Sequence, residues 1–238
     1  MIFDQAEFDI RCEWGAQGIA QLAPISDAIV IVDVLSFSTC VEIAVSRGAR
    51  VFPYRWHDES AQAFAQFLKA ELATKRGAGY SLSPASLAAI PAGTRLVLPS
   101  PNGSTLSLAT GQVPTLLGCL RNRTAVAQAA LTYGPRIAVI PCGERWADGS
   151  LRPAFEDLVG AGAIISCLPG ARAPETMAAE MVWRLAQADL LRQLKHCASG
   201  KELSERGYAQ DVELAAQLDS SACVPVLQQG AFVRWASG

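Results

Sequence analysis

Short apolar stretches alternate along this chain with polar turns and amphipathic segments. The β-branched run Ile29–Leu35 is typical of a buried strand, and the segment Ser38–Arg47 that follows has helical spacing and ends before Gly48. Arg50–Arg55 then resumes as a short strand. This order of strand, helix and strand favours an α/β fold with a mostly parallel sheet between two helical layers, a three-layer α/β/α architecture.

The same patterns predict the other elements. Strands are expected at Leu96–Pro99, Thr115–Gly118 and Ile137–Pro141, with a closing strand pair at Val224–Gln228 and Ala231–Trp235. Helices are expected at Asp58–Arg76, from about Thr105, at Thr124–Tyr133, Phe155–Leu168 and Glu175–His196, and within Gly200–Leu218, whereas Ser81–Gly93 is expected to be a loop. The sequence has no Gly/Ser/Pro-rich linker, so residues 1–238 are predicted to form one compact domain, which could consist of two packed similar halves, 1–115 and 116–238.

Composition narrows the range of partners. Half of the 238 residues are hydrophobic, which is ample for a core, and the formal net charge is only −2. No Lys/Arg-rich run marks a nucleic-acid or anionic-membrane binder, so a small molecule or a protein is the expected partner. The N-terminal stretch lacks the features of a signal peptide and no apolar run approaches the roughly 20 residues of a membrane span. A cytoplasmic location without membrane association is expected, with a homodimer as the default assembly.

Cysteine and histidine offer no ready metal site. The seven cysteines are odd in number and widely spaced, without a C-x-x-C pair, so most are expected to be reduced core residues. The two histidines, His57 and His196, are too few for a histidine-based metal cage. Candidate chemistry is therefore sought in the turns that follow the strands, where an open α/β sheet gathers its ligands.

Asp33 is a carboxylate inside an otherwise apolar strand. An ionised carboxylate is costly there unless it meets a metal, an arginine or several N–H donors. One interpretation is a metal-binding or acid–base residue at a strand end. The other is a carboxylate that caps the next helix.

The turn Ser100-Pro101-Asn102-Gly103-Ser104 joins a strand to a helix. Its Asn and Gly residues tolerate left-handed conformations, and its N–H groups, with the helix dipole, could hold a phosphate. It is not a Walker A motif, because the G-x-x-x-x-G-K-[ST] pattern is missing. An ordinary helix cap is an equally good interpretation of this turn.

The turn Arg121-Asn122-Arg123-Thr124 also lies between a strand and a helix. Its two guanidinium groups and its amide could clamp an anion. The alternative, which we favour, is a solvated turn with Thr124 as the N-cap.

A further polar group, Cys142-Gly143-Glu144-Arg145, follows the strand at 137–141. Cys142 could be a nucleophile if a helix end or a cation favoured its thiolate, but the C-x-x-x-x-x-R loop of cysteine phosphatases is missing. A packed thiol is the better interpretation.

Glu156 and Asp157 begin the helix that comes next. Adjacent carboxylates on a helix point in different directions, so one could reach a site while the other caps the helix or pairs with Arg145. Two or three carboxylates with water suit Mg²⁺, which keeps much of its hydration and also binds substrate phosphate.

Taken in order, these motifs resemble a known family. The chain resembles the 2-phosphosulfolactate phosphatase family of coenzyme M biosynthesis. The stretches that carry this resemblance are VDVLSFST, LSP, SPNGS, the Gly118-to-Asn122 turn, CGER and FEDLVGAG. Members of that family carry V-D-V-L-R-A-[ST]-T, T-N-G-T and L-E-D-x-x-x-A-G. The C-terminal GYAQDVELAAQLDSSACVPVL also looks like the tail of that family. The resemblance spans nearly the whole chain.

The resemblance implies a Mg²⁺-dependent phosphatase that acts on the phosphate ester of a small 2-hydroxy acid, in a three-layer α/β fold. Our hypothesis is that the SPNGS and Asn122 turns hold phosphate, while Asp33, Glu156 or Asp157 bind Mg²⁺ and position water. The complete set of candidates comprises Asp33, Glu156, Asp157 and Cys142 for catalysis, the first three also for metal, and Ser36, Arg76, Ser100, Asn102, Gly103, Ser104, Asn122, Gly143, Glu144 and Arg145 for phosphate or substrate.

Departures from the family pattern affect the expected substrate. Ser36 stands where the family has Arg, and a serine cannot make the bidentate contacts of a guanidinium. Arg76, within Lys75-Arg76-Gly77, takes the place of the arginine in a family G-E-R-G. These changes indicate a divergent branch that recognises another acid. They also leave open a non-catalytic protein that binds a small anion on the same fold, for which Mg²⁺ would be dispensable.

Overall fold

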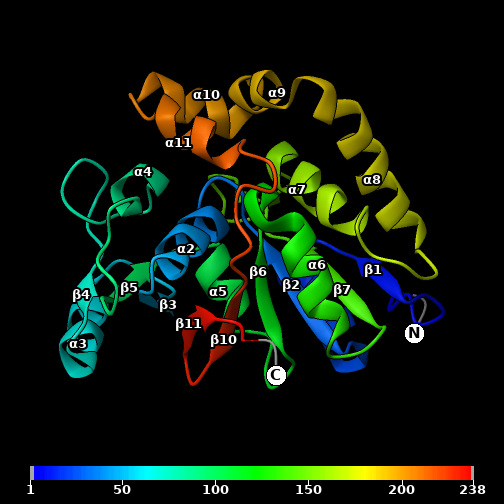
Figure 1. The fold of residues 1–238 in the computed structure, drawn as a ribbon, viewed down its shortest axis with the longest axis horizontal. Coiled ribbons are helices and arrows are strands. Elements are labelled where there is room, and N and C mark those ends of the chain that lie inside the picture. The colour runs from blue at the N-terminus through cyan, green and yellow to red at the C-terminus, as the bar shows by residue number, and fades with distance from the viewer. Residues whose placement is uncertain (1–2, 237–238) are drawn as a thin grey trace.

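A nine-stranded sheet forms the centre of the computed structural model, which describes residues 3–236 (Figure 1). The strands, in sheet order, are β1 (Ile10–Cys12), β7 (Ile137–Pro141), β2 (Ala28–Val32), β6 (Thr115–Gly118), β10 (Pro225–Gln228), β11 (Ala231–Arg234), β3 (Arg50–Tyr54), β5 (Arg95–Pro99) and β4 (Glu71–Leu72). Neighbours run parallel except around β10 and β11, which pair antiparallel with each other and with β6 and β3. The mostly parallel sheet predicted from the sequence is confirmed.

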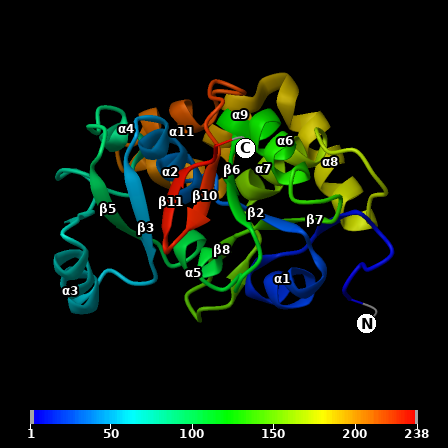
Figure 2. The ribbon, with the colours of Figure 1, turned by 60° about the horizontal axis from the view of Figure 1, so that its bottom comes forward.

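Helices cover both faces of this sheet, as Figures 1 and 2 show. The helices are α1 (Gly15–Leu22), α2 (Phe37–Ser46), α3 (Glu59–Leu68), α4 (Pro84–Leu87), α5 (Gly103–Ser107), α6 (Arg123–Leu131), α7 (Phe155–Ile165), α8 (Pro174–Ala186), α9 (Leu190–His196), α10 (Ala198–Glu205) and α11 (Ala209–Ala215). Short 3₁₀ turns lie at Ala23–Ile25, Leu120–Asn122 and Gln187–Asp189, and β8 (Glu144–Arg145) pairs with β9 (Leu151–Arg152) as a separate hairpin.

Strand β2 shows why the fold has three layers. All five of its residues are buried, as expected for an interior strand of a parallel sheet. Because side chains alternate along a strand, Val30 and Val32 join the core under α6 and α7. Ile29 and Ile31 join the opposite core, under α1, α2 and α5. The sheet therefore has an apolar layer on each side.

The predicted strands at 96–99, 115–118 and 137–141 and the closing pair near the C-terminus are confirmed as β5, β6, β7, β10 and β11. The sequence did not predict that this closing pair lies inside the sheet, between β6 and β3. It also did not predict β1 and α1, because β1 has only three residues. Strand pairing of this kind depends on partners far away in the sequence.

The predicted helix Asp58–Arg76 is wrong in its second half. Helix α3 ends at Leu68, because Lys69 adopts a left-handed backbone conformation with φ of 50°. The chain then pairs with β5 as the short edge strand β4. Arg76 consequently lies on a loop, from which it reaches the end of β2.

Two other segments differ from the predicted elements. The predicted helix Glu175–His196 is divided into α8, a 3₁₀ turn and α9, with a non-helical Asp189 (φ −146°) before α9. The predicted loop Ser81–Gly93 contains the short helix α4. The division between α8 and α9 lets the chain turn, and α9, α10 and α11 lie above α2 and α7 in Figure 1.

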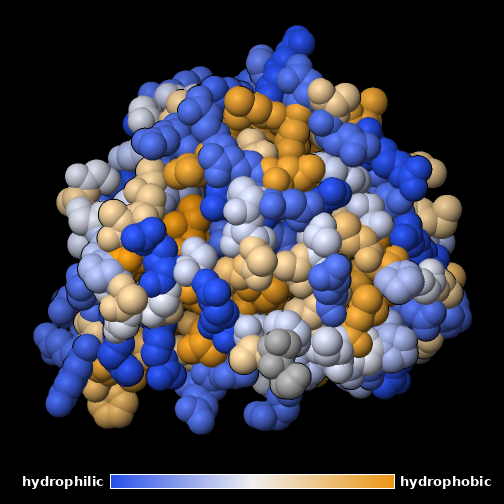
Figure 3. All heavy atoms as spheres, viewed as in Figure 1, coloured by the Kyte–Doolittle hydropathy of each residue, from blue (hydrophilic) through white to orange (hydrophobic). Residues whose placement is uncertain are grey.

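Strands from the first and second parts of the chain interleave in one sheet. Strand β2 lies between β7 and β6, so residues 1–115 and 116–238 share a core, and their similarity to each other stays a prediction. Within residues 3–236, every helix falls short of the length or the hydropathy that a membrane span requires. The face seen in Figure 3 is a mixture of hydrophilic surface and separate apolar patches.

Close packing of α7 on α8 gives a first testable prediction. A Cβ atom on Gly162 would lie 2.0 Å from the carbonyl oxygen of Ala179 in α8. Gly162→Ala should therefore lower the free energy of unfolding by about 2–3 kcal/mol in urea titrations, despite the better helix propensity of alanine. Gly111→Ala is the control, because its Cβ would meet nothing within 4 Å and only its φ of 68° is unfavourable. Equal losses for the two variants would contradict the close-packing argument.

Candidate functional site

Six of the predicted site residues line one cavity of about 170 Å³ near the ends of β2, β5 and β7. They are Asp33, Ser36, Arg76, Ser100, Asn102 and Glu144. The sequence analysis missed the other lining residues, which are Leu35, Leu82, Pro101, Ser199, Glu202 and Leu203. Five separate segments therefore meet here: the β2–α2 turn, the loop before α4, the turn after β5, the turn after β7, and α10.

Asp33 caps the helix that follows it, which is one of the two roles that the sequence left open. Its Oδ1 accepts a hydrogen bond from the Phe37 N–H (3.0 Å), which satisfies the start of α2, and its Oδ2 accepts one from the Gly103 N–H (3.0 Å). The carboxylate also lines the cavity. The pKa of Asp33 is raised to about 6, mainly by burial and in smaller part by the charge of Glu156, while the two N–H donors oppose the shift.

Gly103 is required where Asp33 meets the turn after β5. A Cβ atom at this position would lie 2.3 Å from Cδ1 of Phe37 and 2.8 Å from Oδ2 of Asp33. The predicted phosphate-holding N–H of Gly103 is therefore already bound to a carboxylate. Ser104 is fully buried and its Oγ donates to the Leu98 carbonyl, so its hydroxyl closes the turn.

Asp157 ties the start of α7 to the ends of two neighbouring strands. Its Oδ1 accepts from the Val34 N–H (2.8 Å) and its Oδ2 from the Gly143 N–H (2.9 Å). Burial raises the pKa of Asp157 well above its ordinary value, and the charges of Asp33 and Glu156 add to the shift. With an N–H bound to each oxygen, this carboxyl group holds the strand ends in place.

Glu144 faces the cavity from the hairpin strand β8. Its Oε2 accepts a hydrogen bond from Nδ2 of Asn102 at 2.9 Å, which joins the turns after β5 and β7. Burial raises the pKa of Glu144 to about 7, and the charge of Asp33 contributes in the same direction. Its carboxyl group is thus the one that can hold or release a proton near neutral pH.

Glu156, the neighbour of Asp157 at the start of α7, is only 2% exposed. Its Oε2 has no hydrogen-bond partner within the described residues. A buried acceptor without a partner is costly. The charge of Glu156 raises the pKa values of Asp33, Glu144 and Asp157.

This concentration of carboxyl groups fits a divalent cation in the type of its donors. Among residues 3–236, no three His, Cys, Asp or Glu side chains are already arranged as a metal-binding group. Mg²⁺ does not need such a group, because it commonly binds one or two carboxylates and completes its shell with water and substrate phosphate. Asp33 and Glu144 both face the cavity and could supply those carboxylates.

Arg76 is the sole cationic side chain among the residues that line this cavity. Its Nη2 donates to Oγ of Ser36 at 2.9 Å, and its Nε lies 3.7 Å from Oδ2 of Asp211. The guanidinium also lies over the ring of Tyr208, 5.6 Å from the centroid. Asp211 in turn accepts from Oγ of Ser83. Arg76 is therefore held at the place where Ser36 departs from the family arginine.

The structure assigns Asn122 to the framework of the fold. It is fully buried, its Oδ1 accepts from the Cys119 N–H, and its Nδ2 donates to the carbonyls of Leu117 and Cys223. With these contacts made, its amide has no part in lining the cavity. The predicted role in phosphate binding is replaced by one in fixing the C-terminal segment to β6.

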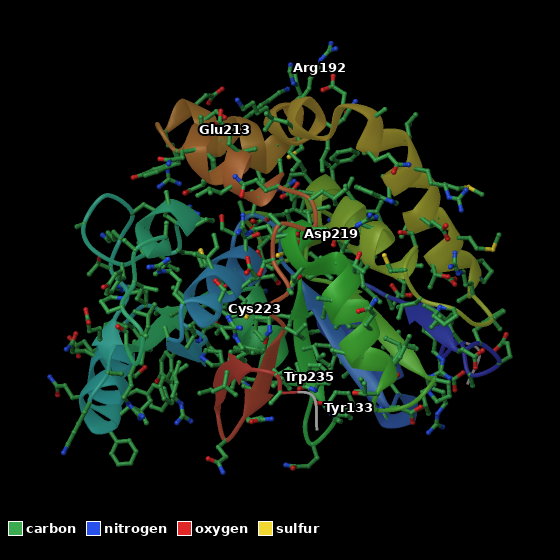
Figure 4. The ribbon with its side chains drawn as sticks, viewed as in Figure 1. Tyr133, Arg192, Glu213, Asp219, Cys223 and Trp235 are labelled. Carbon is green, nitrogen blue, oxygen red and sulfur yellow. The ribbon has the colours of Figure 1, made fainter. Side chains whose placement is uncertain are left out.

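The neighbouring arginines are likewise engaged in internal ion pairs. Nε of Arg121 lies 2.6 Å from Oε2 of Glu42, and Nε of Arg123 lies 2.8 Å from Oδ2 of Asp219. Asp219 also accepts from the N–H of Thr124, so a distant aspartate caps α6 in place of Thr124 itself (Figure 4). The anion clamp considered for this turn is not formed.

Cys142 and Arg145 lie beside the cavity, in the lining of a neighbouring one. Cys142 is buried, and burial raises the pKa of its thiol well above the ordinary value, with Asp33 and Asp157 adding to the shift. Such a thiol stays protonated and is a poor nucleophile. The guanidinium of Arg145 donates to the carbonyls of Gly149 (3.2 Å) and Pro101 (3.5 Å).

Helix α10 forms one wall of the cavity, and the sequence analysis did not predict this. Ser199 and Glu202 line the cavity, and Nη2 of Arg152 lies 3.4 Å from Oγ of Ser199. The Ser-Gly pair at the start of this helix signals an N-terminus, but no local pattern places that terminus over the end of β2. Its position depends on how α8, α9 and α10 turn back over the sheet.

Comparisons with known proteins identify the family of this chain. A family model described as 2-phosphosulpholactate phosphatase matches residues 17–230. A protein of Thermosynechococcus vestitus, named a probable 2-phosphosulfolactate phosphatase, is 33% identical over 220 residues, covering 84% of this chain and 88% of its own length. A protein of Methanothermobacter thermautotrophicus, named 2-phosphosulfolactate phosphatase, is 28% identical over 212 residues, covering 86% of this chain and 88% of its own.

The two hydrogen bonds of Asp157 generate the second prediction. In Asp157→Asn, one oxygen is replaced by an NH₂ group that faces a backbone N–H, so a buried donor loses its acceptor. We expect a loss of about 1–3 kcal/mol in the free energy of unfolding, measured in urea at pH 7. Asp148→Asn is a matched control, because Asp148 also accepts from a backbone N–H, that of Ser150, but is exposed. Its loss should stay below about 0.5 kcal/mol, and similar losses for both variants would refute the anchoring role.

Proposed function

The chain belongs to the 2-phosphosulfolactate phosphatase family of phosphoric monoester hydrolases, and from this premise we propose that it uses Mg²⁺ to hydrolyse the phosphate ester of a small 2-hydroxy acid. The observation that carries the proposal is one cavity in which the carboxyl groups of Asp33 and Glu144 face the guanidinium of Arg76. Carboxylates suit the metal and a guanidinium suits the anion.

Arg76 and the polar groups around it would bind the substrate. Its guanidinium would pair with a phosphate or carboxylate oxygen of the ester, and the hydroxyl of Ser36 lies within 2.9 Å of the same guanidinium. Asn102 and Ser100 line the facing wall. A cavity of about 170 Å³ has room for a small phosphoester.

Mg²⁺ would be held by Asp33 together with water and the substrate phosphate, which leaves the carboxyl group of Glu144 free to carry a proton. When bound, the ion would neutralise negative charge on the phosphate oxygens and orient a water molecule. Asp157, predicted from the sequence as a ligand, is better suited to holding the strand ends, since it accepts two N–H groups and, unlike Asp33, does not line the cavity. Glu156 would add negative charge that stabilises a cation at this place.

The proposed reaction is a displacement at phosphorus. A bond forms between phosphorus and the oxygen of the attacking water, while the bond between phosphorus and the ester oxygen breaks. The water loses a proton and the alcohol oxygen of the leaving 2-hydroxy acid gains one, so inorganic phosphate and the free hydroxy acid are the products. Glu144 lies where it can take up or supply such a proton, and Asn102 orients its carboxyl group through the 2.9 Å hydrogen bond.

The rival function is a protein that binds a small anion without hydrolysing it. Ser36 favours this rival, because the resemblance gives that position an arginine in the family. The two functions differ in their need for metal, since Arg76 can bind an anion without it.

The third prediction therefore uses release of inorganic phosphate from a panel of 2-phospho-hydroxy acids, including 2-phosphosulfolactate and 2-phospholactate. We expect release with Mg²⁺ and none with EDTA. Asp33→Asn should abolish release, and Glu144→Gln should lower kcat by about a hundredfold or more, because glutamine can still accept from Asn102 but cannot carry a proton.

Glu213→Gln is the control for charge removal, because Glu213 lies on α11 and pairs with Lys195 at the surface (Figure 4). Its turnover should match that of the wild type. Unfolding curves of Asp33→Asn and Glu144→Gln would separate a loss of fold from a loss of chemistry. Anion binding that persists in EDTA, without turnover of any ester in Mg²⁺, would favour the rival function.

A fourth prediction concerns Cys142, the alternative covalent nucleophile. Because its thiol is buried and its pKa is raised, Cys142→Ser should lower kcat by less than about tenfold. Loss of a true nucleophile lowers kcat by about a thousandfold or more. A loss of that size in a folded variant would establish Cys142 as the nucleophile.

A further inference from the structure

A second cavity, of about 220 Å³, adjoins the first on the side of α1, α5 and the β8–β9 hairpin. Figure 2 shows α1, α5 and β8 on the same side of the molecule. The two cavities share Asn102 and Glu144, whose hydrogen bond forms the boundary between them. A ligand attached at Arg76 could therefore extend past this pair into the second cavity.

The second cavity differs from the first in character. Its walls are largely apolar and include Trp14, Leu106 and Leu151. Its cationic residue, Arg145, already donates to two backbone carbonyls. A cavity of about 150 Å³ with aliphatic and aromatic walls is large enough to hold benzene, so this one has room for a ring-sized group.

Gly143 and Gly15 have left-handed conformations beside Leu151. A Cβ atom on Gly143 (φ 67°) would lie 2.7 Å from Cδ1 of Leu151 and 3.5 Å from the ring of Trp14, so a side chain there would displace Leu151 from its place in the wall. A Cβ atom on Gly15 (φ 57°) would lie 3.6 Å from the same Leu151 carbon, which is an ordinary van der Waals contact.

The first cavity, in contrast, offers little to a highly charged substrate. A phosphosulfolactate carries a phosphate, a carboxylate and a sulfonate, and among the lining residues only Arg76 is a cation. Ser36 stands where the family motif has a second arginine, and it is occupied in holding Arg76. A bound Mg²⁺ would serve the phosphate, which leaves the sulfonate without a charged partner.

We propose that the substrate is the phosphate ester of a 2-hydroxy acid with an apolar, ring-sized side group, which lies between Trp14, Leu106 and Leu151 while the phosphate and carboxylate lie beside Arg76. This inference rests on the proposed phosphatase function and names its substrate class. Leu151 and Trp14 are then specificity-determining residues, since they contact the side group and not the reacting phosphate.

The test compares three esters that share the 2-phosphate and the carboxylate: those of 3-phenyllactate, lactate and sulfolactate. With Mg²⁺, kcat/KM should be highest for the phenyllactate ester and at least about tenfold lower for the sulfolactate ester, a difference of the size that an apolar pocket can supply. A higher kcat/KM for the sulfolactate ester would overturn the inference while leaving the phosphatase function intact.

A variant links this preference to the second cavity. Leu151→Lys places a cation among the apolar walls, and Leu151 is 42% exposed, so the fold should tolerate the change. The ratio of kcat/KM for the phenyllactate ester to that for the lactate ester should fall about tenfold. Leu191→Lys, at a leucine that is 39% exposed on α9, should leave the ratio unchanged. Equal ratios for the two variants would also overturn the inference.

Failure of the phosphatase function has a different signature. If none of the three esters releases phosphate, the affinity of the protein for each ester is measured by calorimetry. These affinities then show which side group the second cavity prefers, independently of any turnover. Tightest binding of the phenyllactate ester would support the apolar side-group site on a non-catalytic protein. Tightest binding of the sulfolactate ester, or equal binding of all three, would refute it.

Discussion

The carboxyl group of Asp157 is the contact on which the arrangement of the site depends. It accepts N–H groups that follow β2 and β7, and so fixes two neighbouring strand ends against the start of α7. Asp33, the residue after β2, repeats this pattern: its two oxygens accept N–H groups from the start of α2 and from the turn after β5. Because strand ends of a parallel sheet leave such N–H groups without partners, buried carboxylates can satisfy them and at the same time collect the turns around one cavity.

These buried carboxylates have an electrostatic consequence. The pKa values of Asp33 and Glu144 are raised to about 6 and about 7, and that of Asp157 is raised well above its ordinary value. A carboxyl group with a raised pKa in the fold is most favourable below its unfolded pKa, and its contribution to stability is lost as the pH rises toward the folded value. At neutral pH the ionised groups repel one another, with Glu156 adding to the repulsion. A cation in the cavity would relieve that repulsion, and the same charge would attract a phosphoester.

The sequence indicated those site residues whose signal is local. Asp33, Asn102 and Glu144 each follow a buried apolar strand, so their convergence follows from the geometry of a parallel sheet, and all three line the cavity. Asn122 has the same local signal but serves the backbone, because its amide meets the carbonyl of Cys223 about a hundred residues away. The placement of Ser199 and Glu202 also depends on distant packing. Periodicity within one segment carries no information about which other segment will cover it.

Arg76 shows how such distant packing can alter specificity without altering the reacting groups. The end of α3 at Lys69 and the short strand β4 bring Arg76 back to the β2–α2 turn, where it meets Ser36. An arginine at position 36 would place a positive charge in the β2–α2 turn itself. In this chain Arg76 places that charge there from a separate loop, which Asp211 of α11 helps to hold. The carboxylates at the strand ends are fixed by backbone hydrogen bonds, whereas Arg76 comes from a loop and Leu151 from a hairpin. In the proposed phosphatase, substitutions in that loop or hairpin would change the acid that is recognised, while the strand ends would continue to hold the carboxylates beside the phosphate.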